Sequence, residues 1–284
     1  MCIRDRMISD IAPGMISIKN GFKGPNFATV SACASSTNAM IDALNYIKMN
    51  YADVIVTGGS EAAVTCAGIG GFNAMHALST RNDDPKTASR PFDRDRDGFV
   101  LGEGSGALIL EEYEHAKKRN AKIYAEFIGG GLSADAYHMT APHPEGIGAK
   151  SVMVNALKNA KISPKEVDAI NMHGTSTPLG DISESIAIKD VFGQHSYNIN
   201  LNSTKSMTGH LLGAAGAIEA ISIILSINKD LIPPTINNYN LDDKIDSKLN
   251  FTISKAQKRI VNIALSNTFG FGGHNAVICI RKYI

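Results

Sequence analysis

Short apolar runs alternate along this chain with segments in which apolar residues recur at helical spacing, and this alternation constrains the fold most. Strands are expected at residues 26–32, 53–58, 106–113, 123–129, 167–172, 198–202, 262–267 and 276–281. Helices are expected at residues 39–47, 114–120, 152–160, 183–192 and 211–228, and residues 80–98 are expected to form the longest loop. This order predicts an α/β fold with helices on both faces of the sheet.

A second cycle of strands and helices begins near Ala121. At roughly 150 residues per domain, a chain of 284 residues corresponds to one large domain or two small ones. We therefore expect two units, 1–121 and 122–284, whose sequences differ and show no repeat of fixed period.

Composition excludes several functional classes. Hydrophobic residues make up 44% of the chain, charged residues 19%, and the net charge is +1, which argues against general disorder and against a nucleic-acid or anionic-membrane partner. The four cysteines, which include Cys2, form no CxxC pair, so a reducing compartment is favoured over a disulfide framework or a zinc site. We expect no membrane span and no signal peptide. Residues 1–6 are either foreign to the native coding sequence or a short disordered terminus.

The first candidate for chemistry is Cys33, at the predicted junction between a strand and a helix. Free backbone N–H groups and the helix dipole at such a junction favour an anion, so we expect a lowered thiol pKa and a nucleophilic thiolate. The alternative is a buried packing residue, the role we expect of Cys66 and Cys279.

Three further segments could join Cys33. His173 follows an apolar strand, and sites in α/β proteins lie at the carboxyl ends of strands. The segment 205–216 (KSMTGHLLGAAG) contains Lys205 and His210, and it lacks the order of a phosphate-binding loop. Glu219 lies in the helix that follows, where a buried carboxylate needs a partner such as Lys205. Residues 269–274 (FGFGGH) form either a plain glycine-rich hairpin or a turn with a backbone N–H for an oxyanion hole.

Taken together, the motifs SACASS, HGTSTPLGD, STKSMTGHLLGAAGAIE and NTFGFGGHNA resemble, in this order, the β-ketoacyl-[acyl-carrier-protein] synthases, specifically the type II condensing enzyme of fatty-acid elongation. The resemblance covers nearly the whole chain. It implies the thiolase-like fold, in which two similar α/β halves pack as five layers (αβαβα). Here the first half, which carries the nucleophile, is expected to be incomplete, and the second half carries both histidines.

The resemblance also implies roles for individual residues. Cys33 would take the acyl group, and His173 and His210 would stabilise the enolate formed when malonyl-carrier decarboxylates. Backbone N–H groups of Cys33 and Phe271 would form the oxyanion hole, with Phe271 also acting as a gate. The remaining assignments are Lys205 and Glu219 as organisers of the site, Phe269 as a supporting residue, Thr175 and Thr177 as contacts of the pantetheine arm, and Asn171, Glu219, Ser266 and Asn267 as a monovalent-cation site.

By the same resemblance, no cofactor is required, since the substrates arrive on the phosphopantetheine of acyl-carrier protein. The implied partners are that carrier and a second copy of the chain, in the cytoplasm, or in a plastid or mitochondrion of a eukaryote. Two alternatives stay open: a ketosynthase of a polyketide pathway, and an inactive fragment that only binds a carrier or a dimer partner.

Length is the main departure from the family pattern. Only about 25 residues precede Asn26, where the family has a substantial segment before the nucleophile strand. We therefore expect an N-terminally truncated chain that exposes sheet edges and apolar faces and folds poorly alone.

Overall fold

The computed structural model describes residues 8–284, so the expectations for residues 1–6 and Cys2 lie outside the described residues. Its helices are α1 (Ile11–Asn20), α2 (Ser35–Lys48), α3 (Cys66–Ala74), α4 (Tyr113–Lys118), α5 (Ile147–Ala160), α6 (Pro178–Phe192), α7 (Lys205–Thr208) and α8 (Ala215–Lys229). Its strands are β1 (Val54–Glu61), β2 (Gly104–Glu111), β3 (Glu126–Ala134), β4 (Ala169–Asn171), β5 (Asn200–Asn202), β6 (Leu231–Ile232), β7 (Gln257–Lys258), β8 (Ile263–Gly270) and β9 (His274–Arg281).

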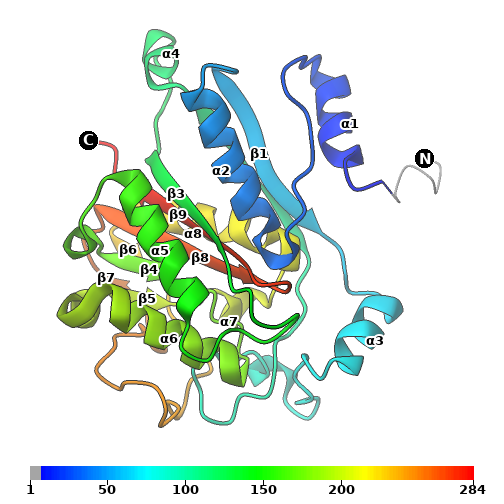
Figure 1. The fold of residues 1–284 in the computed structure, drawn as a ribbon, viewed down its shortest axis with the longest axis vertical. Helices are drawn as coiled ribbons and strands as arrows, with labels where there is room; N and C mark the ends of the chain where they lie inside the picture. Colours follow the sequence, from blue (N-terminus) through cyan, green and yellow to red (C-terminus); the bar gives the residue numbers. More distant parts are fainter. Residues whose placement is uncertain (1–7) are drawn as a thin grey trace.

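The centre of the molecule is a mixed five-stranded sheet in the order β3-β9-β8-β4-β5. Strands β8, β4 and β5 run parallel to one another, whereas β9 is antiparallel to both β3 and β8. Figure 1 shows α5 and α6 in front of this sheet and α8 behind it. The α/β class predicted from the sequence is therefore confirmed.

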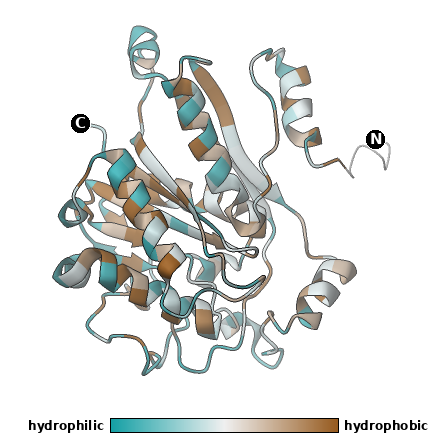
Figure 2. Ribbon diagram, viewed as in Figure 1, coloured by the Kyte–Doolittle hydropathy of each residue, from teal (hydrophilic) through white to brown (hydrophobic). Residues whose placement is uncertain are grey.

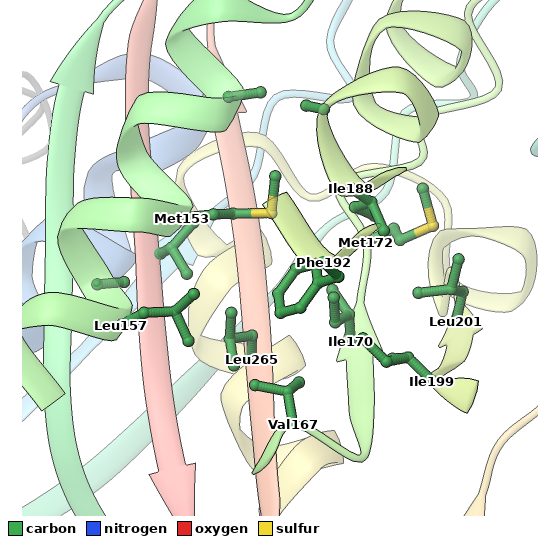
Figure 3. Packing of buried hydrophobic residues seen from close by; sticks show 14 of the residues in the cluster. Met153, Leu157, Val167, Ile170, Met172, Ile188, Phe192, Ile199, Leu201 and Leu265 are labelled. Carbon is green, nitrogen blue, oxygen red and sulfur yellow. The ribbon is translucent and has the colours of Figure 1, made fainter. Parts of the chain in front are cut away.

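A large apolar core lies between the sheet and helices α5 and α6. Met153 and Leu157 of α5 and Ile188 of α6 point toward Ile170 of β4 and Leu265 of β8 (Figure 3). Helical spacing of the apolar residues places them on the face that meets the strands. Figure 2 shows apolar residues gathered where these helices meet the strands and polar residues on the outer turns.

A second apolar core joins the other face of the sheet to α2, α8 and the antiparallel pair β1–β2. The layers among residues 8–284 are thus α5 with α6, the five-stranded sheet, α2 with α8, and the β1–β2 pair, which make four of the five predicted layers. Val54, Val56 and Ile109 lie on the outer face of β1–β2 and are 38–66% exposed. This face matches the expectation of exposed apolar surface in the first half.

The predicted strand at 26–32 is wrong. Residues 22–31 form no strand in the structure, because none of the strands among residues 8–284 lies alongside to pair with them. The segment is mostly exposed, including Phe27 and Val30. The other predicted elements are present with shifted ends: β3 begins at Glu126, for example, and α8 begins at Ala215 after a short 3-10 helix.

One helical stretch, Leu212–Lys229, is long and apolar enough by composition to cross a membrane, although no membrane span was expected. Just over half of it (56%) is buried inside the structure. Its residues Ala217, Ala220 and Ile223 pack with Ala264 of β8 and Leu108 of β2, as expected of a core helix.

Candidate active site

Cys33 lies in a sharp turn that leads into α2. The turn is a 3-10 helix, Ala32–Ala34, and Ala32 adopts the left-handed backbone conformation with a φ of 51°, which is uncommon for a residue other than glycine. Cys33 itself is buried, with 6% of its surface exposed. The turn thus holds the thiol at the amino end of a 14-residue helix.

The other candidate residues follow the three parallel strands. His173 lies just after β4, Lys205 begins α7 after β5, and Phe271 follows β8. Because these strands are parallel, their carboxyl ends meet at the same edge of the sheet. This arrangement brings His173, Lys205 and Phe271 to one edge of the sheet.

The side chains of His173, Lys205, His210 and Glu219 lie close to Cys33. His210 Nε2 lies 3.1 Å from Cys33 Sγ, and the rings of His173 and His210 are 5.2 Å apart at an angle of 87°. Lys205 forms a buried ion pair with Glu219, as the sequence predicted. All of these side chains are buried, so their electrostatic interactions are weakly screened by water.

Both histidines are neutral in this environment. Burial, followed by the positive charge of Lys205, lowers the pKa of His173 and of His210 well below the usual value. A neutral imidazole carries one N–H, so each ring can donate one hydrogen bond to an oxygen that becomes negative during a reaction.

The Cys33 thiol differs from the expectation of a lowered pKa. Burial raises the pKa of Cys33 to about 11, although Lys205 and the backbone N–H groups of Phe271 and Cys33 oppose the rise. The prediction relied on the helix terminus and omitted desolvation, which is the larger effect for a thiol this deep. Cys33 is therefore a neutral thiol at pH 7 in this structure.

Phe271 and Phe269 lie in and beside the turn between β8 and β9, in contact with the site. The backbone N–H groups of Phe271 and Cys33 both act on Cys33 Sγ. Gly270 packs directly against the turn that contains Cys33, since a Cβ on Gly270 would lie 2.9 Å from Ser31 O and 3.1 Å from Cys33 N. The Phe269 ring lies 5.7 Å from that of His173. Two N–H groups thus converge where an oxyanion on a Cys33 adduct would form.

A cavity of about 370 Å³ opens onto Cys33, His173 and His210. Thr175 and Thr177 line it, with their hydroxyl oxygens 3.0 Å apart. A cavity of this size can hold a flexible chain with a few polar groups, and the two hydroxyls offer hydrogen bonds to such a chain.

The predicted cation site is only partly assembled. Asn171 and Ser266 are paired across β4 and β8, and Asn171 Oδ1, Ser266 Oγ and Glu219 Oε2 are buried with no hydrogen-bond partner within residues 8–284. The Asn267 side chain lies on the opposite face, where its Nδ2 donates to Glu184 at 3.0 Å, because successive residues of a strand alternate between faces. The Asn267 side chain therefore points away from Asn171 and Ser266, and its part in a cation site stays a prediction. Across the same residues, no cluster of three His, Cys, Asp or Glu side chains could hold a metal ion.

Sequence reasoning missed Glu184, a buried carboxylate of α6 that lines the cavity. It accepts the backbone N–H groups of His173 and Gly174, both at 2.9 Å. Burial raises the pKa of Glu184 to about 7, against these hydrogen bonds. An acidic residue on the buried side of an apolar helix was the signal available in the sequence.

Two further histidines, His138 and His143, line the cavity. Cys66, interpreted as a packing residue, is exposed, whereas Cys279 is buried as expected.

The chain is similar to known proteins over nearly its full length. It is 52% identical to 3-oxoacyl-[acyl-carrier-protein] synthase 2 of Synechocystis sp. over 98% of the chain, and 51% identical to the protein of that name from Coxiella burnetii over 97%. In both cases it spans 66% of the relative's length.

Among solved structures, a type II PKS ketosynthase in complex with its acyl-carrier protein and bound to the hexaketide matches with a TM-score of 0.94 at 39% identity, over 97% of this chain and 67% of that one. The predicted thiolase-like fold is thereby confirmed. Residues 3–116 match the N-terminal domain of the beta-ketoacyl synthase family and residues 124–239 its C-terminal domain. The chain belongs to the β-ketoacyl synthase family.

Proposed function

We propose that this protein is an acyltransferase that joins an acyl group on Cys33 to a two-carbon unit from malonyl-[acyl-carrier protein], giving 3-oxoacyl-[acyl-carrier protein] in fatty-acid elongation. The observation that carries this proposal is the buried cluster of one thiol and two neutral histidines, with Cys33 Sγ 3.1 Å from His210 Nε2. The similarity to two 3-oxoacyl-[acyl-carrier-protein] synthases supports it.

In the first step, Cys33 Sγ attacks the carbonyl carbon of the acyl thioester. The thiol proton passes to the departing carrier sulfur as the thioester bond to the carrier breaks. The backbone N–H groups of Cys33 and Phe271 receive the oxyanion of the tetrahedral intermediate. The C–S bond to the carrier then breaks and leaves the acyl group on Cys33.

In the second step, the bond between the malonyl carboxylate and its neighbouring carbon breaks, and carbon dioxide leaves. The electron pair forms an enolate, whose oxygen accepts hydrogen bonds from the N–H groups of His173 and His210. The enolate carbon attacks the acyl-Cys33 carbonyl. The bond to Sγ then breaks, and Cys33 leaves as a thiolate that takes up a proton from water to restore the thiol. Because decarboxylation creates the nucleophile, no strong base is required.

The remaining residues would organise these steps. The Lys205–Glu219 pair keeps a positive charge near both histidines, and this charge helps to hold them neutral. Thr175 and Thr177 would bind the pantetheine arm from the cavity wall, with Phe271 as its gate. The unpartnered oxygens of Asn171, Ser266 and Glu219 would suit a monovalent cation, which would neutralise buried negative charge.

The wider assignments are also part of the proposal. Acyl-carrier protein would deliver both substrates, a second copy of the chain would complete a homodimer, and the protein would work in the cytoplasm. The division into 1–121 and 122–284 stays a prediction.

The decisive experiment is to mix the purified protein with an acyl-carrier thioester and then with malonyl-carrier. We expect an acyl adduct on the peptide that contains Cys33, detected by mass spectrometry, and its conversion to a 3-oxoacyl thioester with release of carbon dioxide. Adduct formation without condensation would restrict the function to acyl transfer, and absence of any adduct would favour a fragment that only binds a carrier or dimer partner.

A polyketide ketosynthase is the alternative that performs the same chemistry. The 39% identity to a ketosynthase bound to a hexaketide is lower than the 52% identity to a 3-oxoacyl-[acyl-carrier-protein] synthase, which favours fatty-acid elongation. Comparison of condensation rates on saturated acyl-carrier and polyketide-carrier substrates separates the two.

A further inference from the structure

Between the two threonines that line the cavity lies a serine that faces the other way. Ser176 is fully buried behind the cavity wall, while Thr175 and Thr177 on either side of it contribute to the cavity lining. The turn therefore has one polar side chain directed into the protein and two at the surface where a substrate would lie.

Ser176 adopts a backbone conformation that serine rarely takes. Its φ is 72°, in the left-handed region that favours glycine. Two hydrogen bonds from the loop at 90–98 hold it there: Arg90 N donates to Ser176 Oγ at 3.1 Å, and Gly98 N donates to Ser176 O at 3.2 Å. Since Arg90 is itself only 6% exposed, its N–H would be left without a partner if the hydroxyl were removed.

The loop at 90–98 also forms hydrogen bonds with the end of the turn that leads into α6. Arg96 Nε donates to Thr177 O at 3.2 Å and Arg96 Nη2 donates to Pro178 O at 2.8 Å. Arg96 Nε also lies 3.1 Å from Asp181 Oδ2 in the first turn of α6. The backbone around Thr175 and Thr177 is thus fixed from both sides before any substrate arrives.

We propose that Ser176 is a positioning residue that presets the hydroxyls of Thr175 and Thr177 for an amide group of the substrate's carrier arm. This role rests on the proposed function, in which the arm passes these threonines. When the two hydroxyls are already in place, binding of the arm does not have to pay the entropic cost of ordering the turn. Loss of the Ser176 hydroxyl should therefore weaken binding of the arm and leave the chemistry at Cys33 unchanged.

The test compares Ser176→Ala and Ser176→Gly with Ser196→Ala, a matched control in which another fully buried serine, bonded to Gly193 O at 2.7 Å, loses its hydroxyl. Ser176→Gly keeps the left-handed backbone without strain and serves if Ser176→Ala is unstable. Acylation of Cys33 is followed by mass spectrometry with an acyl-pantetheine thioester and with the S-ethyl thioester of the same acyl group, which has no amide. Iodoacetamide measures the reactivity of the thiol alone.

We expect both Ser176 variants to raise the half-saturating concentration of acyl-pantetheine about 5- to 10-fold, with the maximal rate within about twofold. The rates with the S-ethyl thioester and with iodoacetamide should stay unchanged, and Ser196→Ala should change none of the three.

Equal losses with both thioesters, or an unchanged half-saturating concentration, would overturn the role of Ser176 alone. Failure of the unsubstituted protein to be acylated by either thioester, while iodoacetamide still labels Cys33, would overturn the proposed function as well.

Discussion

The chain turns into a long helix twice in nearly the same way, but only one of the two turns carries a nucleophile. The first turn contains Ala32 (φ 51°), continues through the 3-10 helix Ala32–Ala34 and leads into α2. The second turn contains Leu212 (φ 45°), continues through the 3-10 helix Leu212–Ala214 and leads into α8. Cys33 and Gly213 occupy the same place in the two turns.

The neighbours of the two turns explain the difference. The end of β8 packs against the first turn through Gly270, and the N–H groups of Cys33 and Phe271 act on the thiol. The end of β1 packs against the second turn, where Gly213 N donates to Glu61 Oε2 at 3.2 Å. In the second turn, the N–H of Gly213 is bonded to a carboxylate. In the first turn, the N–H at the same place, that of Cys33, faces the thiol. The shared backbone is a scaffold, and the chemistry depends on what meets it.

The largest effect that tests this comparison comes from Cys33→Ala. We expect the rate of condensation to fall by roughly 10⁴-fold or more, because removal of a covalent nucleophile leaves only binding and the oxyanion hole. The exposed cysteine gives the matched control, Cys66→Ala, which should keep the full rate. If Cys33→Ala condensed at the rate of the unsubstituted protein, Cys33 would not be the nucleophile.

A pH series examines the state of the thiol in the first turn. The pKa of Cys33 is raised to about 11, and higher pH increases the reactive thiolate, so the rate of alkylation by iodoacetamide should rise about tenfold per unit between pH 7 and 10. Mass spectrometry of the Cys33 peptide gives the rate. A rate independent of pH in this range would indicate a preformed ion pair of the thiolate with His210.

Glycine substitutions compare the packing of the two turns directly. Gly270→Ala places a Cβ 2.9 Å from Ser31 O and 3.1 Å from Cys33 N, and the resulting displacement should lower the acylation rate about 10²-fold. In Gly213→Ala the Cβ lies 3.2 Å from Glu61 Oε2, the end of a flexible side chain, so we expect less than a threefold change. Equal effects in the two variants would show that the turns are coupled as one unit.

The smallest effect concerns stability. Ser36 Oγ in α2 accepts a hydrogen bond from the backbone N–H of Ala217, near the start of α8, at 3.0 Å. Loss of this hydrogen bond in Ser36→Ala should lower the free energy of unfolding by about 1 kcal/mol, measured by urea denaturation. Ser226→Ala, whose hydroxyl bonds only within α8, is the control and should change it by less than about half as much. Equal losses would mean that the two helices are not held together by this bond.

Local sequence patterns predicted most of the strands and helices, although they did not predict α1 and α3. Strand and helix periods mark the order of elements, and the carboxyl ends of β4, β5 and β8 bring His173, Lys205 and Phe271 together. The motif resemblance added roles that periodicity alone does not supply.

Other features depend on contacts that no local pattern encodes. Residues 26–32 have the composition of a strand, but a strand needs a partner, and the described residues provide none beside them. The pKa of Cys33 depends on burial by distant segments, and the bonds from Ser36 to Ala217 and from Gly213 to Glu61 join residues 181 and 152 positions apart. The pKa and both hydrogen bonds depend on how segments far apart in the sequence pack together.

The raised pKa of Cys33 also bears on the reaction of this thiol with oxidants. Peroxides react with thiolates that solvent can reach, and Cys33 is a buried neutral thiol at pH 7. With a pKa of about 11, only about one molecule in 10⁴ carries the thiolate at that pH. We therefore expect slow oxidation of Cys33 to a sulfenic acid by peroxide.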